Sequence, residues 1–171
     1  MPFVVAALAD LAAVYFLVMR AKNAAEMTTE LLGVADDVRA AARRFGFRRR
    51  HDLHSVDSVD DANLALATVA VAYMELHGLP TERTQSNLLK ALQRELNVDL
   101  SDAEELSVLG RWLMNECKGA TPAITRASKR LYRMDKNVTA LMAVLKDLSD
   151  TPISDQQRDA LHDIKQAFHI R

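Results

Sequence analysis

Several residue types that commonly carry structure or chemistry are scarce in this sequence. It has a single cysteine, Cys117, which excludes an internal disulfide and leaves no second thiol for a metal site. Only five glycines, four prolines and 5% aromatic residues occur among 171 positions. Sheet proteins use more aromatic and turn-forming residues, whereas Ala and Leu, which favour helices, are abundant here. The composition therefore predicts an all-α protein.

A strong overall charge is also lacking, because the formal net charge is −1. A general electrostatic attraction to nucleic acid or to acidic lipid is therefore not expected, and any such attraction must be local. The charge is uneven: residues 20–50 contain eight Lys or Arg and four Asp or Glu, and residues 51–171 contain fourteen and eighteen. A basic neck thus precedes an acidic body.

One long apolar run is present, at residues 3–19, and it contains a single charged side chain, that of Asp10. As a helix the run is about 25 Å long, slightly short of a ~30 Å hydrocarbon core. Its Leu, Val and Phe residues favour insertion by roughly 3–5 kcal/mol, against a cost of about 3 kcal/mol for the aspartate. The run predicts a marginal transmembrane helix. A cleaved signal peptide, which lacks its basic start here, and a packing helix in a soluble oligomer are the alternatives.

The residues around and within this run predict its orientation and its contacts. Because cations follow the run and none precedes it, the positive-inside rule places the N-terminus outside and the remaining chain in the cytoplasm, as a single-pass protein of the inner (cytoplasmic) membrane. A carboxylate inside a membrane usually faces protein or water, and small residues allow close helix packing. We therefore expect docking to another membrane protein or to a second copy, although a simple anchor that tolerates the aspartate is the alternative. The expected packing face consists of Ala6, Ala9, Asp10 and Ala13.

The helical pattern continues without proline to about residue 45, so residues 1–45 are predicted to form the membrane helix and its cytoplasmic extension. Residues 46–57 are predicted to be a basic and polar linker. A cationic cluster interleaved with Phe45 and Phe47 spans this junction. Its members are Arg43, Arg44, Arg48, Arg49 and Arg50. It is either a solvated linker, a site of salt bridges between helices or a patch for anionic lipid heads, with nucleic acid as the least favoured partner.

Apolar residues at helical spacing predict a compact bundle of about six helices over residues 58–171. Capping patterns mark the ends of these helices. Starts are expected at Ser58 or Asp57, at Thr81, at Ser101 with Glu104, at Thr121 with Pro122, near Asn137, and at Ser154 with Gln157, and stops at Gly78 with Pro80, near Asn97 and near Gly119.

Two short segments and the helix between them resemble a known family. Residues 77–84 (HGLPTERT) and 150–157 (DTPISDQQ) are similar to turns of the form Asp-Gly-x-hydrophobic-Ser-x-x-Glu, and residues 97–113 (NVDLSDAEELSVLGRWL) resemble the loop and leucine-rich helix between them. Over residues 60–168 the chain thus resembles the tellurite-resistance TerB-like domain, and also the N-terminal domain of some membrane-anchored DnaJ-type co-chaperones. The resemblance implies a helical fold and an association with membrane stress responses.

In that family the acidic residues of the two turns are thought to form a cation site. This sequence departs from the pattern, with His77, Thr84 and Gln157 at three of the four acidic positions. A weakened site is imaginable, and its candidate ligands are Asp150, Glu82 and Asp155, with His77 as a further one. Acidic residues in a first helical turn also have an ordinary role in complementing the helix dipole, so no metal or cofactor is expected.

No catalytic arrangement is recognisable in the sequence. The five histidines lack metal-ligand spacing, no glycine-rich phosphate loop is present, and Cys117 lies among apolar residues near a helix end, as a small buried side chain does. We therefore expect a non-enzymatic, membrane-tethered interaction module with a protein partner. The alternatives are an accessory subunit that docks through its N-terminal helix and a divalent-cation-binding domain.

Overall fold

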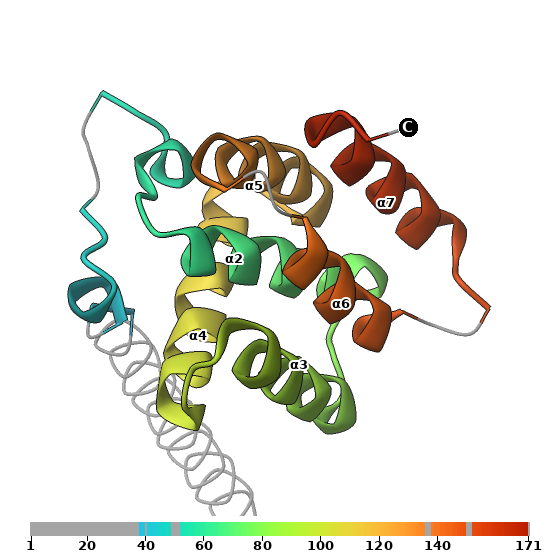
Figure 1. The fold of residues 1–171 in the computed structure, drawn as a ribbon, viewed down its shortest axis with the longest axis horizontal. Coiled ribbons are helices and arrows are strands. Elements are labelled where there is room, and N and C mark those ends of the chain that lie inside the picture. The colour runs from blue at the N-terminus through green and yellow to red at the C-terminus, as the bar shows by residue number, and fades with distance from the viewer. Residues whose placement is uncertain (1–37, 40, 49–51, 136–137, 150–151, 171) are drawn as a thin grey trace, which may run out of the picture. The chain divides into compact units, whose positions relative to one another are not determined.

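The computed structural model describes residues 38–39, 41–48, 52–135, 138–149 and 152–170. Within these ranges all regular secondary structure is helical and no strand occurs, which confirms the predicted all-α class for this part of the protein (Figure 1). Six α-helices form the bundle, namely α2 (Ala62–Met74), α3 (Glu82–Leu96), α4 (Leu100–Glu116), α5 (Ala120–Met134), α6 (Thr139–Leu148) and α7 (Asp155–Ala167), with two 3-10 helices, η1 (Ser55–Ser58) and η2 (Glu75–His77). The described residues before them include helical positions from Val38 to Arg44.

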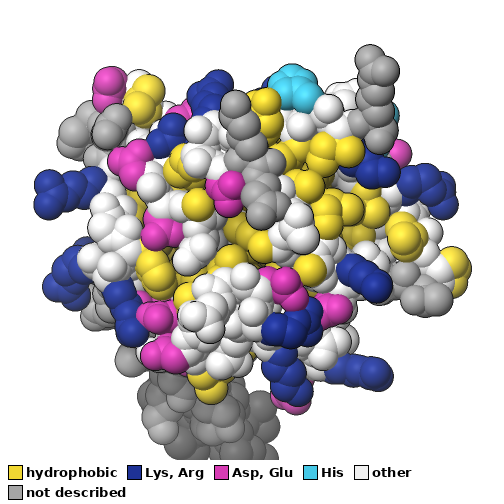
Figure 2. Space-filling view, viewed as in Figure 1, with side chains coloured by type: hydrophobic (Ala, Val, Ile, Leu, Met, Phe, Trp, Pro, Cys, Tyr) yellow, Lys and Arg dark blue, Asp and Glu magenta, His cyan; other side chains and the backbone are white. Residues whose placement is uncertain are grey.

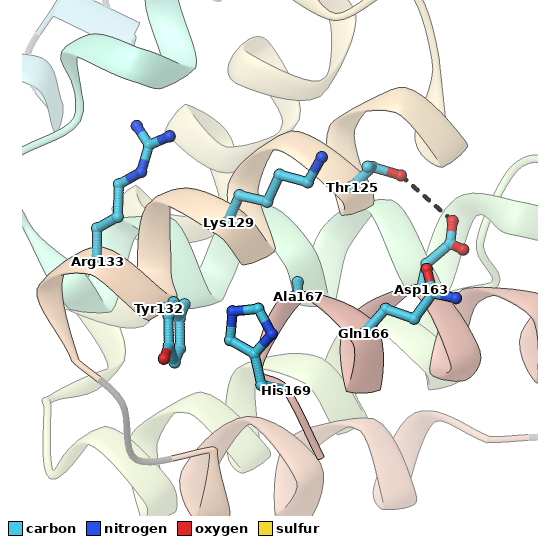
Figure 3. Close-up of a pocket in the computed structure, with 8 residues that line it drawn as sticks. All are labelled: Thr125, Lys129, Tyr132, Arg133, Asp163, Gln166, Ala167 and His169. Carbon is cyan, nitrogen blue, oxygen red and sulfur yellow. Dashed lines mark hydrogen bonds between the residues drawn. The ribbon is translucent and has the colours of Figure 1, made fainter. Parts of the chain in front are cut away.

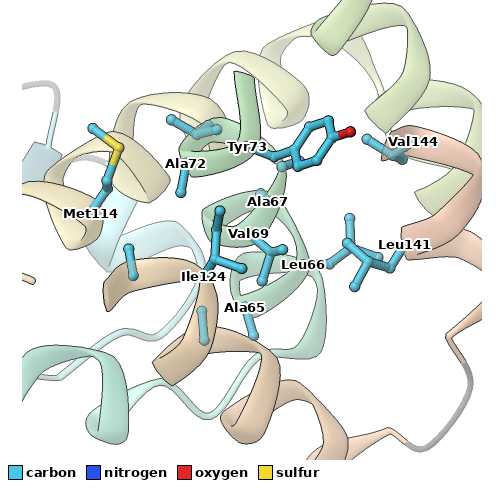
Figure 4. Packing of buried hydrophobic residues seen from close by; sticks show 14 of the residues in the cluster. Ala65, Leu66, Ala67, Val69, Ala72, Tyr73, Met114, Ile124, Leu141 and Val144 are labelled. Carbon is cyan, nitrogen blue, oxygen red and sulfur yellow. The ribbon is translucent and has the colours of Figure 1, made fainter. Parts of the chain in front are cut away.

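Helix α2 occupies the centre of the bundle, with α4, α5 and α6 packed around it (Figures 1 and 4). Its sequence, ANLALATVAVAYM, has no charged residue, and every position from Leu64 to Met74 is buried. A helix that is apolar on all sides is stable only inside a protein. Its two buried hydroxyl groups are hydrogen-bonded: the Thr68 hydroxyl donates to the Leu64 carbonyl at 2.8 Å, and the Tyr73 hydroxyl lies 2.9 Å from that of Ser149. Burial of α2 therefore leaves neither hydroxyl without a partner.

A glycine allows α4 to lie directly against α2. Gly110 is fully helical, and a Cβ atom placed there would lie 3.3 Å from the carbonyl carbon and oxygen of Ala67 and from the Cα of Thr68. These are backbone atoms, which cannot swing aside as a flexible side chain could. The absent side chain at Gly110 thus sets the spacing between the two helices.

Several predicted helix ends are confirmed. Thr81 caps α3, its hydroxyl accepting a hydrogen bond from the Thr84 amide, and α3 ends at Asn97 in the left-handed conformation (φ 52°). Ser154 and Gln157 form the predicted capping box at the start of α7. In each case the residues that fix the end are neighbours in sequence, so the local pattern is sufficient.

Two predicted starts are wrong because a nearby aspartate is the cap. Asp61, not Ser58 or Asp57, caps α2 by accepting from the Leu64 amide at 2.9 Å. Ser58 instead ends the short helix η1.

The start of α4 is displaced in the same way. Asp99 caps this helix by accepting from the Asp102 amide at 2.8 Å, so Ser101 lies within the first turn and makes no capping box with Glu104. At both helix starts the sequence has several possible capping residues within a few positions, and the local pattern does not rank them.

The predicted start of α5 at Thr121 and Pro122 is also wrong. The N-cap is Gly119, and Pro122 occupies the third helical position. Lys118 (φ 64°) and Gly119 (φ 137°) turn the chain so tightly that α5 begins three residues after α4 reaches its cap at Cys117. Gly119 is at a φ that side-chain-bearing residues rarely adopt, so only a glycine suits this turn.

The segment predicted as a linker packs on the bundle where the structure describes it. The compact unit begins at Val38, and a helix ends at Arg44, followed by Gly46 (φ 62°). Farther along, Val56 and Val59 are each 1% exposed. The described part of residues 46–57 is therefore held against the helices by side chains of its own.

The predicted membrane helix at residues 3–19 and its packing face lie outside the described residues. Within the described ranges, no helix combines the length and the apolar character needed to cross a membrane.

Candidate functional site

The described residues between Val38 and Asp61, here called the strap, run along α4 and α5 and join whatever precedes residue 38 to the bundle (Figure 1). Three apolar side chains, Ala41, Val56 and Val59, reach the core from this segment. Polar contacts with α4 and α5 accompany them along the length of the strap. The strap is thus attached at several points and not at one end alone.

Arg44 and Phe47 attach the beginning of the strap to α4. The Arg44 guanidinium lies 2.5 Å from Asp102 and 3.1 Å from Glu105. Its hydrogen bond to Glu105 is the main cause that raises the pKa of Arg44 above its ordinary value. The Phe47 ring meets the Trp112 ring edge-on, with 5.7 Å between ring centres. A charged contact and an aromatic contact therefore hold the same stretch of chain on one helix.

The end of the strap is attached mainly to α5. Arg126 pairs with Asp57 at 2.8 Å. Arg130 donates from Nε to the Val59 carbonyl at 2.5 Å and pairs through its other nitrogen with Asp60 at 2.6 Å. The Arg130 side chain is 20% exposed and its partner Asp60 is 64% exposed, whereas Arg126 and Asp57 are 44% and 35% exposed. The partly buried hydrogen bond from Arg130 to the Val59 carbonyl is therefore the best shielded of these contacts.

The predicted basic patch is divided by the structure. Arg44 is engaged with acidic residues of α4, whereas Arg43 and Arg48 are exposed. Arg49 and Arg50 lie outside the described residues. Among the alternatives for the patch, a salt bridge between helices therefore describes Arg44.

Two of the three main metal candidates, Glu82 and Asp155, lie within the described residues. Glu82 is exposed in the first turn of α3, Asp155 pairs with Arg158 at 2.6 Å within α7, and Asp150 is outside the described residues. The described part of the chain contains no cluster of three or more His, Cys, Asp or Glu residues suited to a metal ion.

Cys117 is buried at the end of α4, as expected for a small apolar side chain. Burial raises the pKa of its thiol, an effect that the positive charge of Arg126 partly offsets. A thiol whose ionisation is disfavoured is a poor nucleophile.

A cleft of about 430 Å³ lies between α5 and the end of α7, here called the α5–α7 cleft (Figure 3). Its lining consists of Thr125, Lys129, Tyr132 and Arg133 from α5, and Asp163, Gln166, Ala167 and His169 from α7 and the residues after it. Figure 3 shows the cationic side chains along the α5 rim, with Lys129 extending toward Thr125. The single proton of the Thr125 hydroxyl is shared between the Thr121 carbonyl at 3.2 Å and Asp163 at 3.3 Å, and the contact with Asp163 joins the two walls.

Aromatic contacts form one end of this cleft. The Tyr132 ring meets the rings of His169 and Phe168 edge-on, with centres 5.1 and 5.7 Å apart. His169 has φ 56° and follows α7 at the position where helices commonly place a glycine, with its amide bonded to the Gln166 carbonyl and the next amide to that of Lys165. The left-handed turn therefore carries the imidazole ring to the wall of the cleft.

A second cleft, of about 610 Å³, lies between η2, the α4–α5 turn and α7. Gly78 and Gln156, one from each of the two turns noted in the sequence, line it together with Glu75 and Asp159. The structure thus brings residues of the two turns to the same cleft, and the two described candidate ligands, Glu82 and Asp155, are not part of its lining.

Comparison of the chain with protein-family models, with curated proteins and with solved structures gives no match. The resemblance to TerB-like domains therefore stays a prediction, and functional inference depends on the geometry just described.

Sequence reasoning did not find the α5–α7 cleft. One signal was present, since Lys129 and Arg133 are one helical turn apart and share a face of the helix. Nothing local, however, indicates that α7 returns to α5, or that His169 adopts a conformation typical of glycine.

Proposed function

We propose that this chain is a non-enzymatic, membrane-tethered helical interaction module, with the N-terminal segment as the tether and the bundle as the part that meets a protein partner. The observation that supports it most is the strap, which attaches the chain after residue 38 to both α4 and α5. The strap follows a defined path over α4 and α5, so this segment and the bundle form one compact unit from Val38 onward.

The surface of the bundle is suited to this role. Figure 2 shows hydrophobic side chains gathered in the centre of one face, between α5, α6 and α7, with charged side chains around its margin. Partly buried apolar residues of these helices include Tyr132, Met142 and Leu161. An apolar centre with a polar rim is the usual composition of a protein interface.

A second candidate is an accessory subunit of a larger membrane complex that docks through the N-terminal helix itself. The face of Ala6, Ala9, Asp10 and Ala13 favours it, because an aspartate in an apolar helix needs a partner. A link to membrane stress responses is implied only by the resemblance to TerB-like domains.

The tether is tested by membrane fractionation of the full chain and of a variant that lacks residues 1–20. We expect the full chain to stay in the membrane fraction after an alkaline carbonate wash and the shortened chain to be released. Recovery of the full chain in the soluble fraction would contradict the proposal.

The two candidates differ in which half contacts the partner. Replacing residues 1–20 with an unrelated apolar span keeps the tether and removes the face around Asp10. If the same partner still co-purifies, the bundle makes the contact. If the partner is lost while the variant remains in the membrane, the N-terminal helix makes it and the accessory-subunit candidate is correct.

A further inference from the structure

We propose that the α5–α7 cleft binds an acidic segment of a protein partner, with a carboxylate of that segment held by Lys129 and Arg133. This inference rests on the proposed function as an interaction module and names the chemistry of its partner. Three observations support the inference: the charges of α5, the shape of the cleft and the polar groups of its α7 wall.

The first step concerns the cations of α5. Arg126 and Arg130 are matched by acidic residues of the strap, whereas Lys129 and Arg133 have no ion pair among the described residues. Both are exposed at the rim of the cleft, which contains one carboxylate, that of Asp163. The cleft therefore carries an excess of positive charge that an anionic group from outside would balance.

The second step concerns shape. A volume of about 430 Å³ is within the range of ligand pockets, roughly 300–1,000 Å³, near its lower end, and suits one or two side chains of a peptide. Tyr132 and Ala167 give the cleft an apolar surface beside the cations. The left-handed conformation of His169 (φ 56°) is uncommon for a residue other than glycine, and it places the imidazole ring edge-on to Tyr132. The aromatic end of the cleft is therefore formed before any ligand arrives.

The third step concerns the kind of anion. The amide nitrogen of Gln166 lies 3.0 Å from the His162 ring and has a second N–H to donate, and its oxygen is an acceptor. Asp163 keeps acceptor capacity beyond its contact with Thr125. Such groups match the N–H and C=O of a peptide main chain next to an acidic side chain. The Asp163 carboxylate repels any anion, but it repels a phosphate, with up to two negative charges, more strongly than a carboxylate with one. A carboxylate within a peptide fits this set of groups better.

The test is selection from a phage-displayed library of random peptides against the full chain in mild detergent. We expect the selected peptides to be enriched in Asp and Glu. The variant Lys129→Glu with Arg133→Glu should lose this enrichment. The matched control, Arg83→Glu with Lys90→Glu, makes the same change in charge at exposed positions of α3 and should keep it. Selection without acidic enrichment, or equal enrichment by the cleft variant, would overturn the inference.

Fluorescence anisotropy with one selected peptide measures how much the cleft substitutions change the affinity. The cleft variant should bind at least about tenfold more weakly than the control variant, and the difference should shrink at high salt. Equal unfolding temperatures of the two variants would show that the loss is not a loss of fold. Displacement of the peptide by millimolar inorganic phosphate would instead assign the cleft to phosphate ligands and overturn the peptide proposal.

Failure of this inference is distinguishable from failure of the proposed function. If the full chain is retained by the membrane but selects no acidic peptide, the cleft assignment is wrong and the tether stands. If acidic peptides are selected through Lys129 and Arg133 but the chain is recovered in the soluble fraction, the tether is wrong and the cleft assignment stands.

Discussion

Helix α5 carries two pairs of cations, each with a spacing of one helical turn, and the two pairs have different surroundings. Arg126 and Arg130 are turned toward the strap and each is paired with an aspartate. Lys129 and Arg133 line a cleft with α7 and have no ion pair among the described residues. Both pairs are cationic and have the same spacing, so the neighbours that the fold supplies distinguish a structural cation from one that is available for binding.

A substitution on the face of α5 that points into the core is expected to lower the free energy of unfolding more than a substitution in either pair of cations. Ile124 is 1% exposed, and Ile124→Ala should lower the free energy of unfolding by about 2–5 kcal/mol, because it removes buried apolar contacts and leaves a cavity. Urea denaturation measures this loss. A loss below about 1 kcal/mol would mean that α5 is not packed on the core as described.

Arg130 should have the larger effect of the two paired cations. Arg130→Ala removes hydrogen bonds to a main-chain carbonyl and to Asp60 from a side chain that is only 20% exposed. We expect a loss of about 1.5–3 kcal/mol, as is typical of hydrogen bonds to charged groups. Lys129→Ala, one position earlier on the same helix, is the matched control, and an equal loss in both variants would remove the distinction between the pairs.

Arg126 should have a smaller effect, because its ion pair with Asp57 is 44% exposed on the arginine side. Arg126→Ala should cost about 0–1 kcal/mol at low salt, and 1 M NaCl should screen most of that difference. Unfolding measured at both salt concentrations checks this expectation. A loss that salt leaves unchanged would show that Arg126 acts by packing and not by charge.

Cys117, at the end of α4, is expected to make the stability of the fold depend on pH. Because burial raises the pKa of its thiol in the folded protein, the unfolded chain loses this proton at lower pH than the folded chain does. Stability should therefore fall as pH rises past the ordinary thiol pKa toward the raised value. Cys117→Ala should remove this contribution to the decline, and the same slope in both proteins would assign it to other groups.

The smallest effect on stability is expected at the cleft. Lys129→Ala and Arg133→Ala remove exposed side chains without an ion pair in the described structure, so unfolding free energies should change by less than about 0.5 kcal/mol. The same variants should nevertheless weaken binding of an acidic peptide. A large loss of stability would make these residues structural, like Arg126 and Arg130.

Sequence patterns were accurate where the physics is local. The start of α3 at Thr81, its end at Asn97 and the capping box of Ser154 with Gln157 each depend on a few adjacent residues, and each is confirmed. Predictions failed where several capping residues lay close together. At the start of α4, Asp99 and Ser101 are both residues that commonly cap helices, and Asp99 is the cap in the structure.

The sequence by itself determined that the described chain is helical, since helix propensity, capping and apolar spacing act over a few residues. Only the tertiary structure decided which cations of α5 are paired. Asp57 and Arg126 are 69 positions apart, and Thr125 and Asp163 are 38 apart. Contacts over such separations exist because the fold closes long loops around α2, and no local pattern shows which side chains will then meet.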